Sequence, residues 1–421
     1  MLHRAAAILA VTVSACVARA DGGGDAAARV FTRSCLPCHG TNGSAPLVLD
    51  SAERIVRNRR LASMLVEDGT MPPSIALPSA DGLVADRRLS SEDRATLLAA
   101  FAAGATDAFD AIKPSTDGRT DDRAAHAHDA IAPARAWTMP ASGGARVRTF
   151  LAPNPSAVRV RGVRVADPGA RAQLPIRMMF LAADPRGTMR VLDAGDDDDG
   201  GFEAMGNVGL VPSGALGALS IVRPSFELPA GFCFEVPAGD IAIETIGEPI
   251  GRAARVLPRV AWIPAGADDT RPVRALAIPA KSLLLRADTC STIEFTHAAR
   301  ADIDIVAVIV KGGAFLRSAE IDVRNDVWND VRNDARAAGN AAPTRLLTVP
   351  DYRMAFAEPW VFTRAQRVTA GSTIVARLGF DNTADNPQQP SRPPQDVEGG
   401  LPPLGEDAMV VVLYAEAANS R

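Results

Sequence analysis

Apolar side chains recur every three or four residues in three windows near the start of the chain, as in helices that cover a core. The third window has the clearest ends. Ser90 with Asp93 three residues later is typical of a capping box, and Gly104 stands where a helix commonly ends in a left-handed residue. We therefore predict a small all-α domain over 21–108. Its helical windows are 26–34, 51–67 and 89–103.

From Trp137 onward the pattern changes to short apolar runs separated by proline and glycine, which favours antiparallel β-sandwiches over βαβ units. The stretch is too long for one small sandwich, and a turn-rich segment at 265–270 suggests a boundary. We predict a linker over 109–135 and two sandwiches over 136–268 and 269–421, so the fold class is multidomain, all-α and then all-β. The expected strands are 157–165, 176–182, 232–236, 241–246, 303–310, 373–380 and 409–414.

The composition agrees with two or three soluble domains, because 47% of the 421 residues are hydrophobic and no long apolar run follows the N-terminus. The net charge is −4, so the chain lacks the basic surface of a nucleic-acid-binding protein. We expect no nucleic-acid partner.

The first 20 residues resemble a secretory signal peptide, since two basic residues precede a short apolar stretch. Two cleavage sites remain open. Val13-Ser14-Ala15-Cys16 resembles a bacterial lipobox and would leave Cys16 as a lipid anchor, whereas Ala18-Arg19-Ala20 would release a chain that begins at Asp21. Either cleavage site predicts a periplasmic or cell-envelope protein. Lipidation of Cys16 would make it an envelope lipoprotein, for example one anchored in the outer membrane.

The run Cys35-Leu36-Pro37-Cys38-His39 carries the most specific chemistry in the chain, because Cys-x-x-Cys-His is the attachment signature of a c-type haem. Two thiols three residues apart can form thioethers to the haem vinyl groups, and the following imidazole can bind the iron. We predict a covalent haem on Cys35 and Cys38, with His39 as an axial ligand. No second cysteine pair exists to complete a zinc site instead.

A second axial ligand is expected downstream. Met71 in Gly69-Thr70-Met71-Pro72-Pro73 presents a thioether on a segment that two prolines hold extended, so it is our predicted ligand. Met64 is the alternative, but it falls in the apolar stripe of the predicted helix, which predicts a core position. The remaining cysteines, Cys233 and Cys290, are expected to be separate buried thiols, although an oxidising compartment would permit a disulfide.

Two parts of the chain resemble one known family. Residues 25–108, with the haem motif and Met71-Pro72-Pro73, resemble the haem domain at the front of bacterial copper type II ascorbate-dependent monooxygenase-like proteins. The C-terminal stretch 379–409 resembles the end of the peptidylglycine and dopamine hydroxylase core. The resemblance implies two tandem jelly-roll-like sandwiches with one copper each, bound by three histidines in the first and by His-x-His plus a methionine in the second. Met409 falls on the position of that methionine.

The histidines that such copper centres need are missing. Pro175-Ile176, the segment 244–248 and Lys311-Gly312-Gly313 stand where the family has its ligands. The chain has five histidines, of which His3 lies in the signal and His39 in the haem motif. Only His126, His128 and His297 remain for centres that require five, so we expect no copper.

Three hypotheses for the function follow. The first is an exported c-type cytochrome that carries single electrons to or from a redox partner protein, with the β-region as a degenerate, copper-free module for binding or docking. The second keeps an oxidoreductase activity at an unrecognised metal site, built from the remaining histidines, Met409 or acidic residues. The third makes the chain a structural envelope lipoprotein.

Overall fold

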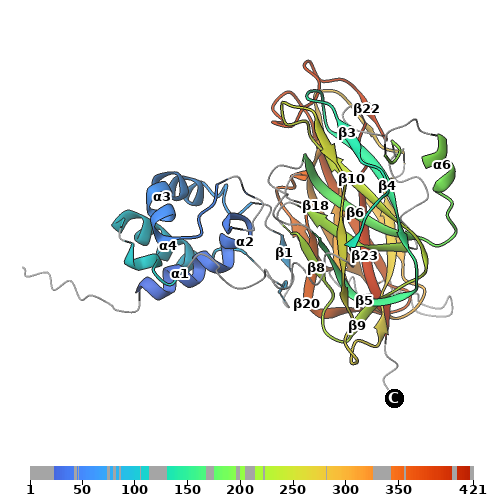
Figure 1. The fold of residues 1–421 in the computed structure, drawn as a ribbon, viewed down its shortest axis with the longest axis horizontal. Helices are drawn as coiled ribbons and strands as arrows, with labels where there is room; N and C mark the ends of the chain where they lie inside the picture. Colours follow the sequence, from blue (N-terminus) through green and yellow to red (C-terminus); the bar gives the residue numbers. More distant parts are fainter. Residues whose placement is uncertain are drawn as a thin grey trace, which may run out of the picture.

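The computed structural model of the chain is largely β-sheet, with helices gathered near the N-terminus (Figure 1). The structure describes residues 23–41, 45, 47–73, 76–78, 82–84, 87–104, 106–112, 130–166, 175–195, 200–203, 214–220, 223–280, 282–325, 343–354, 357–400 and 405–417.

The three expected helices are confirmed. Ser90 Oγ accepts a hydrogen bond from the Asp93 N–H at 3.0 Å, and the Asp93 carboxylate accepts from the Ser90 N–H at 3.1 Å, so the capping box is also present. Gly104 ends the last helix with φ of 64°. The helical unit consists of α1 (Gly23–Ser34), α2 (Leu36–His39), α3 (Ala52–Glu67), α4 (Ser91–Ala103) and the 3-10 helix η1 (Asp107–Phe109).

A small aromatic core holds these helices together. The rings of Phe31, Phe101 and Phe109 contact one another edge-on or stacked, with centroids 5.7 to 6.4 Å apart. Ile112 is also buried in this core. The helical unit therefore extends to Ile112 and takes in the start of the segment expected as a linker, of which 113–129 lies outside the described residues.

The first β-sandwich is built from two antiparallel sheets, apart from one parallel pair at an edge. One sheet has the order β4 (Arg146–Asn154), β10 (Gly239–Gly247), β6 (Ile176–Asp184) and β7 (Ala215–Ser220). The other has the order β13 (Arg271–Pro272), β9 (Phe232–Val236), β5 (Val158–Val165), β12 (Val260–Pro264) and β2 (Ala130–Ile131), with β8 (Ser225–Glu227) also paired with β5. A ribbon of β3 (Trp137–Met139) and β11 (Ala254–Val256) and the short helix α6 (Arg190–Gly195) complete this body.

The second β-sandwich follows at once, because β13 still pairs in the first body and β14 already pairs in the second. Its larger sheet has the order β1 (Leu77–Pro78), β19 (Thr344–Val349), β18 (Leu316–Arg324), β21 (Thr373–Asn382) and β16 (Thr289–Ala298). Its smaller sheet has the order β14 (Arg274–Pro279), β23 (Met409–Glu416), β17 (Ile303–Lys311) and β20 (Pro359–Val368), and β15 (Leu284–Leu285) pairs with β22 (Val397–Glu398).

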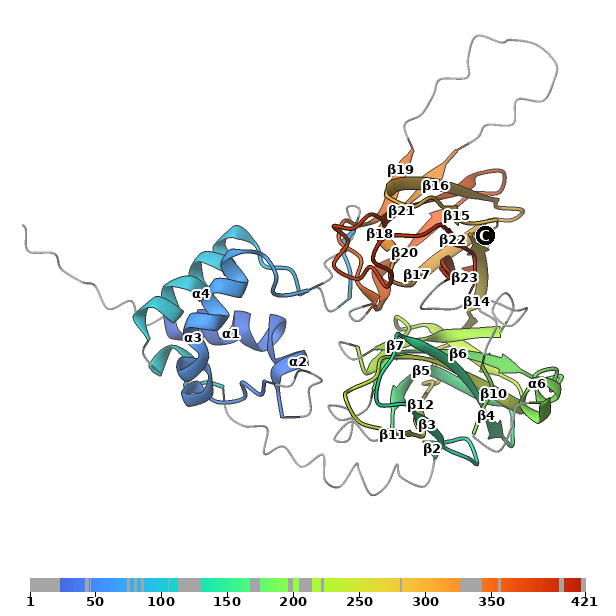
Figure 2. The same ribbon diagram turned by 90° about the horizontal axis from the view of Figure 1, so that it is seen from above.

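The two sandwiches pack against each other through their four-stranded sheets (Figure 2). β7 contacts both β14 and β20, and all the residues of β7 and β17 are buried. Strands covered on both faces lack the alternation of apolar and polar residues that one exposed face produces. This is why 305–310 is an unbroken apolar run, whereas β16, at the edge of its sheet, has no buried residue.

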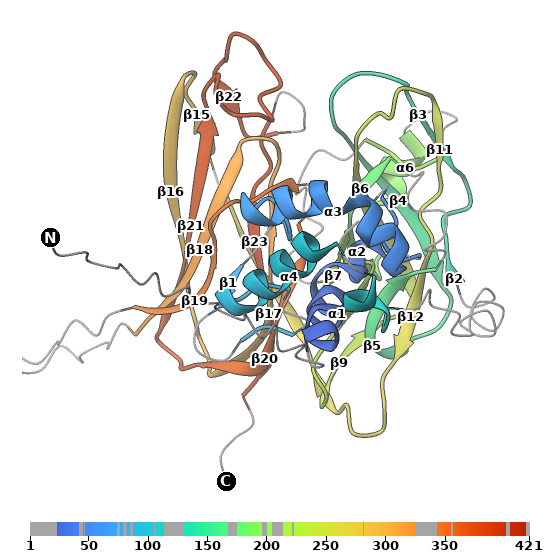
Figure 3. The same cartoon turned by 90° about the vertical axis from the view of Figure 1, so that its left-hand side faces the viewer.

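The helical unit is joined to the second sandwich by the segment between α3 and α4. After α3, the chain adds β1 to the edge of the larger sheet, with Leu77 opposite Thr348. Leu83 then forms a bridge with Phe362 before the chain returns to begin α4. Figure 3 shows the helices lying in front of both sandwiches. Among the described residues, no helix is long and apolar enough to cross a membrane.

Candidate functional site

The Cys-x-x-Cys-His motif forms the single turn of α2, with Cys35 at its N-cap directly after α1. The His39 N–H donates to the Cys35 carbonyl at 2.9 Å, which places the residues of the motif on successive positions of that turn. Cys35 and Cys38 are not joined in a disulfide, and burial together with the neighbouring Cys38 raises the pKa of Cys35 to about 12. A protonated Cys35 does not favour a metal site, which requires thiolates.

The His39 ring is oriented by a backbone carbonyl. Its Nδ1 lies 2.7 Å from the Leu47 carbonyl oxygen. Because a carbonyl only accepts, Nδ1 carries the proton and Nε2 keeps its lone pair. The loop that supplies this carbonyl is itself tied to the motif, since the Leu49 N–H donates to the His39 carbonyl at 2.7 Å. Metal-bound imidazoles are commonly fixed in this way, so His39 fits the role of an iron ligand.

The two candidate methionines occupy different settings. Met71 is half-buried in a turn, and its N–H donates to the Leu65 carbonyl at 2.8 Å. Met64 has 53% of its surface exposed, so the expectation that it lies in the core is wrong. The buried face of α3 runs through Ile55 and Val66, and at 100° per residue Met64 lies on the opposite side of the helix.

The remaining candidate ligands do not gather. His297 lies half-buried on β16, where burial and the nearby Arg300 lower its pKa. Cys233 is buried as expected, but Cys290 is exposed on the edge strand, so that expectation is wrong. Among the described residues, no group of three or more His, Cys, Asp or Glu could hold a metal ion. Cys16, His126 and His128 lie outside the described residues.

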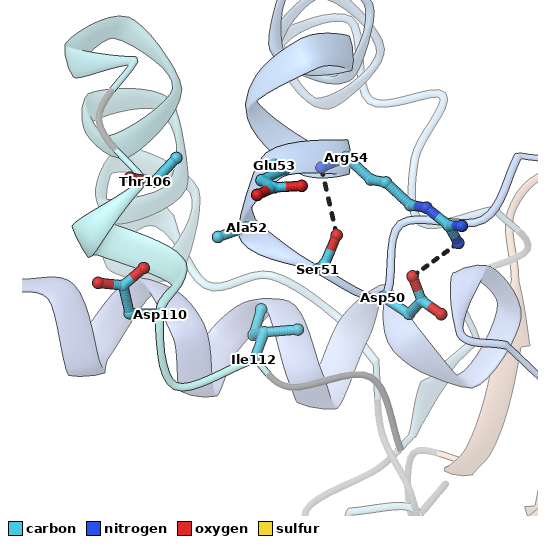
Figure 4. A pocket seen from close by; sticks show the side chains of 8 residues that line it. All are labelled: Asp50, Ser51, Ala52, Glu53, Arg54, Thr106, Asp110 and Ile112. Carbon is cyan, nitrogen blue, oxygen red and sulfur yellow. Dashed lines mark hydrogen bonds and ion pairs between the residues drawn. The ribbon is translucent and has the colours of Figure 1, made fainter. Parts of the chain in front are cut away.

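A cavity of about 570 Å³ opens beside the start of α3 (Figure 4). Its polar side chains already serve the helix. Ser51 Oγ accepts from the Arg54 N–H at 3.4 Å, and the Asp50 carboxylate accepts from the Arg54 guanidinium at 2.9 Å. These contacts satisfy hydrogen-bonding groups in the first turn of α3, so the polar residues Asp50 and Ser51 beside the cavity have a structural role.

A second cleft, of about 560 Å³, lies where the helical unit meets both sandwiches. Pro37 of the Cys-x-x-Cys-His motif forms part of its wall. The first sandwich contributes the stretch 223–229, and the second contributes Pro359 and Val361. The cleft therefore lies between the Cys-x-x-Cys-His motif and the β-region.

One carboxylate at this cleft connects all three parts of the molecule. Glu358, in the second sandwich, accepts a hydrogen bond from Arg87 at 2.5 Å and from Arg223 at 2.9 Å. Arg87 precedes α4 in the helical unit, and Arg223 precedes β8 in the first sandwich. The three side chains are 6%, 9% and 18% exposed, in the order Glu358, Arg87 and Arg223. The sequence analysis missed this cluster because 271 positions separate Arg87 from Glu358.

Two of the segments that the resemblance assigns to copper ligands meet in a second cluster, between the sandwiches. The Lys311 ammonium lies 2.6 Å from the Glu244 carboxylate of the first sandwich and 2.7 Å from Asp407 of the second. Burial would lower the pKa of Lys311, but these two carboxylates outweigh it and raise the pKa above its usual value. Met409 is buried in the apolar core directly opposite Lys311 in the sheet register.

Beside Lys311, Glu406 is buried without a cationic partner among the described residues. Its carboxylate accepts hydrogen bonds from the backbone N–H groups of Gly313 and Phe315. Burial raises the pKa of Glu406 to about 7, and the nearby Asp407 adds to the rise. Burial and the Glu406 carboxylate also raise the pKa of Tyr352, whose hydroxyl donates to the Gly312 carbonyl at 3.2 Å.

No family model and no curated protein matches the chain. Among solved structures it is similar to the major capsid protein P2 of bacteriophage PM2, with 10% identity over 69% of this chain and 98% of that chain and a TM-score of 0.25. N-glycanase F (PNGase F) gives 11% identity over 68% and 95% of the two chains and a TM-score of 0.25. The VP2 subviral particle of infectious bursal disease virus gives 8% identity over 69% of this chain and 76% of that chain, with a TM-score of 0.17. TM-scores this low carry no argument about fold or function.

Proposed function

We propose that this protein is a c-type cytochrome that carries single electrons, with its β-region as a copper-free module for binding or docking. The orientation of His39 is the observation that carries the proposal, because its Nδ1 is held by the Leu47 carbonyl and its Nε2 is left to bind iron. Cys35 and Cys38 hold the haem covalently, and Met71 completes the axial pair. Bound haem supplies one-electron oxidation and reduction, and a filled axial pair leaves no open coordination position for a substrate.

The haem assignment is tested by the spectrum of the purified full chain. The reduced protein should show a c-type α-band that survives acid-acetone extraction. The double change Cys35→Ser/Cys38→Ser should abolish covalent haem, whereas Cys290→Ser, an exposed thiol in the β-region, should retain it. Haem that extracts from the unmodified chain would disprove the attachment.

The axial ligand is tested by a matched pair of methionine variants. Met71→Ala should remove the charge-transfer band between methionine and ferric iron, and Met64→Ala should leave it intact. The reverse result would assign the iron to Met64, whose exposed side chain on α3 would then have to turn toward the haem.

We also propose that the chain is exported to the periplasm or cell envelope, where a redox partner protein exchanges electrons with the haem. Acylation of Cys16 would provide a stable anchor if two or more acyl chains are attached. Mass spectrometry of the mature N-terminus decides between an acylated Cys16 and a soluble chain that begins at Asp21.

The absence of copper chemistry is the remaining part of the proposal. It is supported by Lys311, because an ammonium group held between Glu244 and Asp407 excludes a cation from the place where the resemblance puts a copper ligand. Protein equilibrated with copper and dialysed against a moderate chelator should retain none stoichiometrically. Retention of one or two copper ions per chain, lost in Met409→Ala, would restore the monooxygenase hypothesis.

A further inference from the structure

The cleft between the helical unit and the sandwiches has the size and lining of a small-molecule site. Its volume of about 560 Å³ lies within the usual range for ligand pockets. Most of its wall is apolar, and Val84 on that wall is 40% exposed. An apolar group placed in the cleft would remove this surface from water, which is favourable in free energy.

The charges of the described residues around the cleft do not balance. Arg33 pairs with Asp93 at 2.8 Å, and Glu227 pairs with Arg161 at 2.8 Å, so these two pairs are neutral. Glu358 faces two guanidinium groups, which leaves one net positive charge. Because Arg87 and Arg223 are mostly removed from water, that charge is poorly compensated by solvent.

The two arginines also retain hydrogen-bonding capacity. Glu358 is bound through one guanidinium nitrogen of Arg87 and through Nε of Arg223. Among the described residues, neither guanidinium has another hydrogen-bond partner. An arginine offers five N–H donors in a planar fork that matches a carboxylate. Both side chains can therefore bind a second anion by donating hydrogen bonds from their remaining N–H groups.

We propose that this cleft binds a carboxylate attached to an apolar body, with Arg87 and Arg223 holding the carboxylate. A single carboxylate cancels the single excess charge, whereas a phosphate would overcompensate it. Two sources present this chemistry beside Pro37: a free organic acid, or a propionate of the haem itself. The second source rests on the proposed function, and the first does not.

In the test, the full chain with its haem attached is titrated with benzoate, and binding is measured by calorimetry. Benzyl alcohol has a similar body without the charge and should bind at least about tenfold more weakly, since it lacks the charge-assisted hydrogen bonds. A propionate in the cleft would instead block benzoate. In that case Arg223→Gln should introduce a pH-dependent step in the haem reduction potential, because the propionate loses a guanidinium partner.

Three variants separate binding from a merely structural role. Arg223→Gln removes the excess charge and should weaken benzoate binding at least about tenfold. Glu358→Gln removes the competing carboxylate and should strengthen it. Arg274→Gln, which removes an exposed partner of Glu416 away from the cleft, should change neither readout. Circular dichroism of each variant confirms that it is folded. If Glu358→Gln is not folded, Arg87→Gln replaces it and should weaken benzoate binding as Arg223→Gln does.

Benzoate binding that follows this order supports a free acid as the ligand. No benzoate binding, together with the new pH-dependent step in Arg223→Gln, supports the haem propionate. The proposal is overturned if benzoate does not bind and the reduction potential of Arg223→Gln shows no such step, or if Arg223→Gln and Glu358→Gln weaken binding equally. A chain without covalent haem that still binds benzoate would refute only the proposed function.

Discussion

Two buried charge clusters hold this molecule together, and they are opposite in sign. At the junction with the helical unit, one anion, Glu358, faces two cations. Between the sandwiches, one cation, Lys311, faces two anions, Glu244 and Asp407. The first cluster borders an open cleft, and the second lies in a sealed interface.

The difference shows how burial decides what balances an excess charge. An open site can take an ion from solution, and we propose a carboxylate for the cleft. A buried site has little access to ions from solution, and there burial shifts the protonation of a neighbouring carboxylate instead. Glu406, next to Asp407, has its pKa raised to about 7 and is largely protonated in mildly acidic solution.

Removing the cation from the sealed cluster should have the largest effect. Lys311→Met removes the cation that lies against the buried Glu244 and the largely buried Asp407, and it should lower the free energy of unfolding by about 3–5 kcal/mol. Urea unfolding of the full chain measures it. Adding Glu244→Gln and Asp407→Asn should recover most of the loss, and a loss below about 1 kcal/mol in the single variant would contradict a sealed interface.

The pH dependence of stability should report Glu406. Its pKa is raised from 4.5 in the unfolded chain to about 7 in the folded one, so its contribution is complete below about pH 4.5 and is lost as the pH rises through about 7. At about 1.4 kcal/mol for each pKa unit, the loss is about 3 kcal/mol.

The comparison that isolates this effect is with Glu406→Gln, because other carboxylates titrate in the acidic part of the same range. The difference in unfolding free energy between the two proteins should change between pH 4.5 and 8 and be constant above that. A constant difference throughout would mean that Glu406 stays ionised in the folded protein.

Removing one cation from the open cluster should cost less. Arg223→Met leaves Arg87 and Glu358 as a neutral pair, so only one charge-assisted hydrogen bond is lost, which corresponds to about 1.5–3 kcal/mol. Thermal unfolding at fixed pH measures it. A loss as large as that of Lys311→Met would erase the distinction between the open and the sealed cluster.

The smallest effect is expected at the rim of the cleft. Arg161 and Glu227 are 37% and 45% exposed, and ion pairs of this kind contribute about 0–1 kcal/mol. Arg161→Gln should therefore shift the unfolding midpoint very little, and less at high salt than at low salt. A salt-independent loss above about 1 kcal/mol would show that the pair is buried in solution.

The local parts of the fold were predictable because their signals are local. The capping box at Ser90 and the apolar run 305–310 in the expected strand each depend on a few neighbouring residues, and both expected elements are present. The Cys-x-x-Cys-His turn belongs to the same class. Met64 was placed wrongly because a helix in a small domain carries apolar residues on more than one side.

Neither charge cluster could be foreseen. Arg87 and Glu358 have ordinary neighbours in sequence, and only the return of the chain after β1 brings them together. In the sequence, Lys311 was notable only because it stands where the resemblance expects a copper ligand. Its pairing with Glu244 depends on how two separate sandwiches face each other, which no local pattern encodes.

The strand β1 has a consequence for the order of events as the chain is made. Its partner β19 lies about 270 residues further along, and at roughly 5–20 residues per second the ribosome needs tens of seconds to reach it. During that time the helical unit cannot pair with β19, and the turn at Cys35 has no sandwich beside it. The early chain therefore passes through an interval in which the thiols of Cys35 and Cys38 are not covered by the sandwiches.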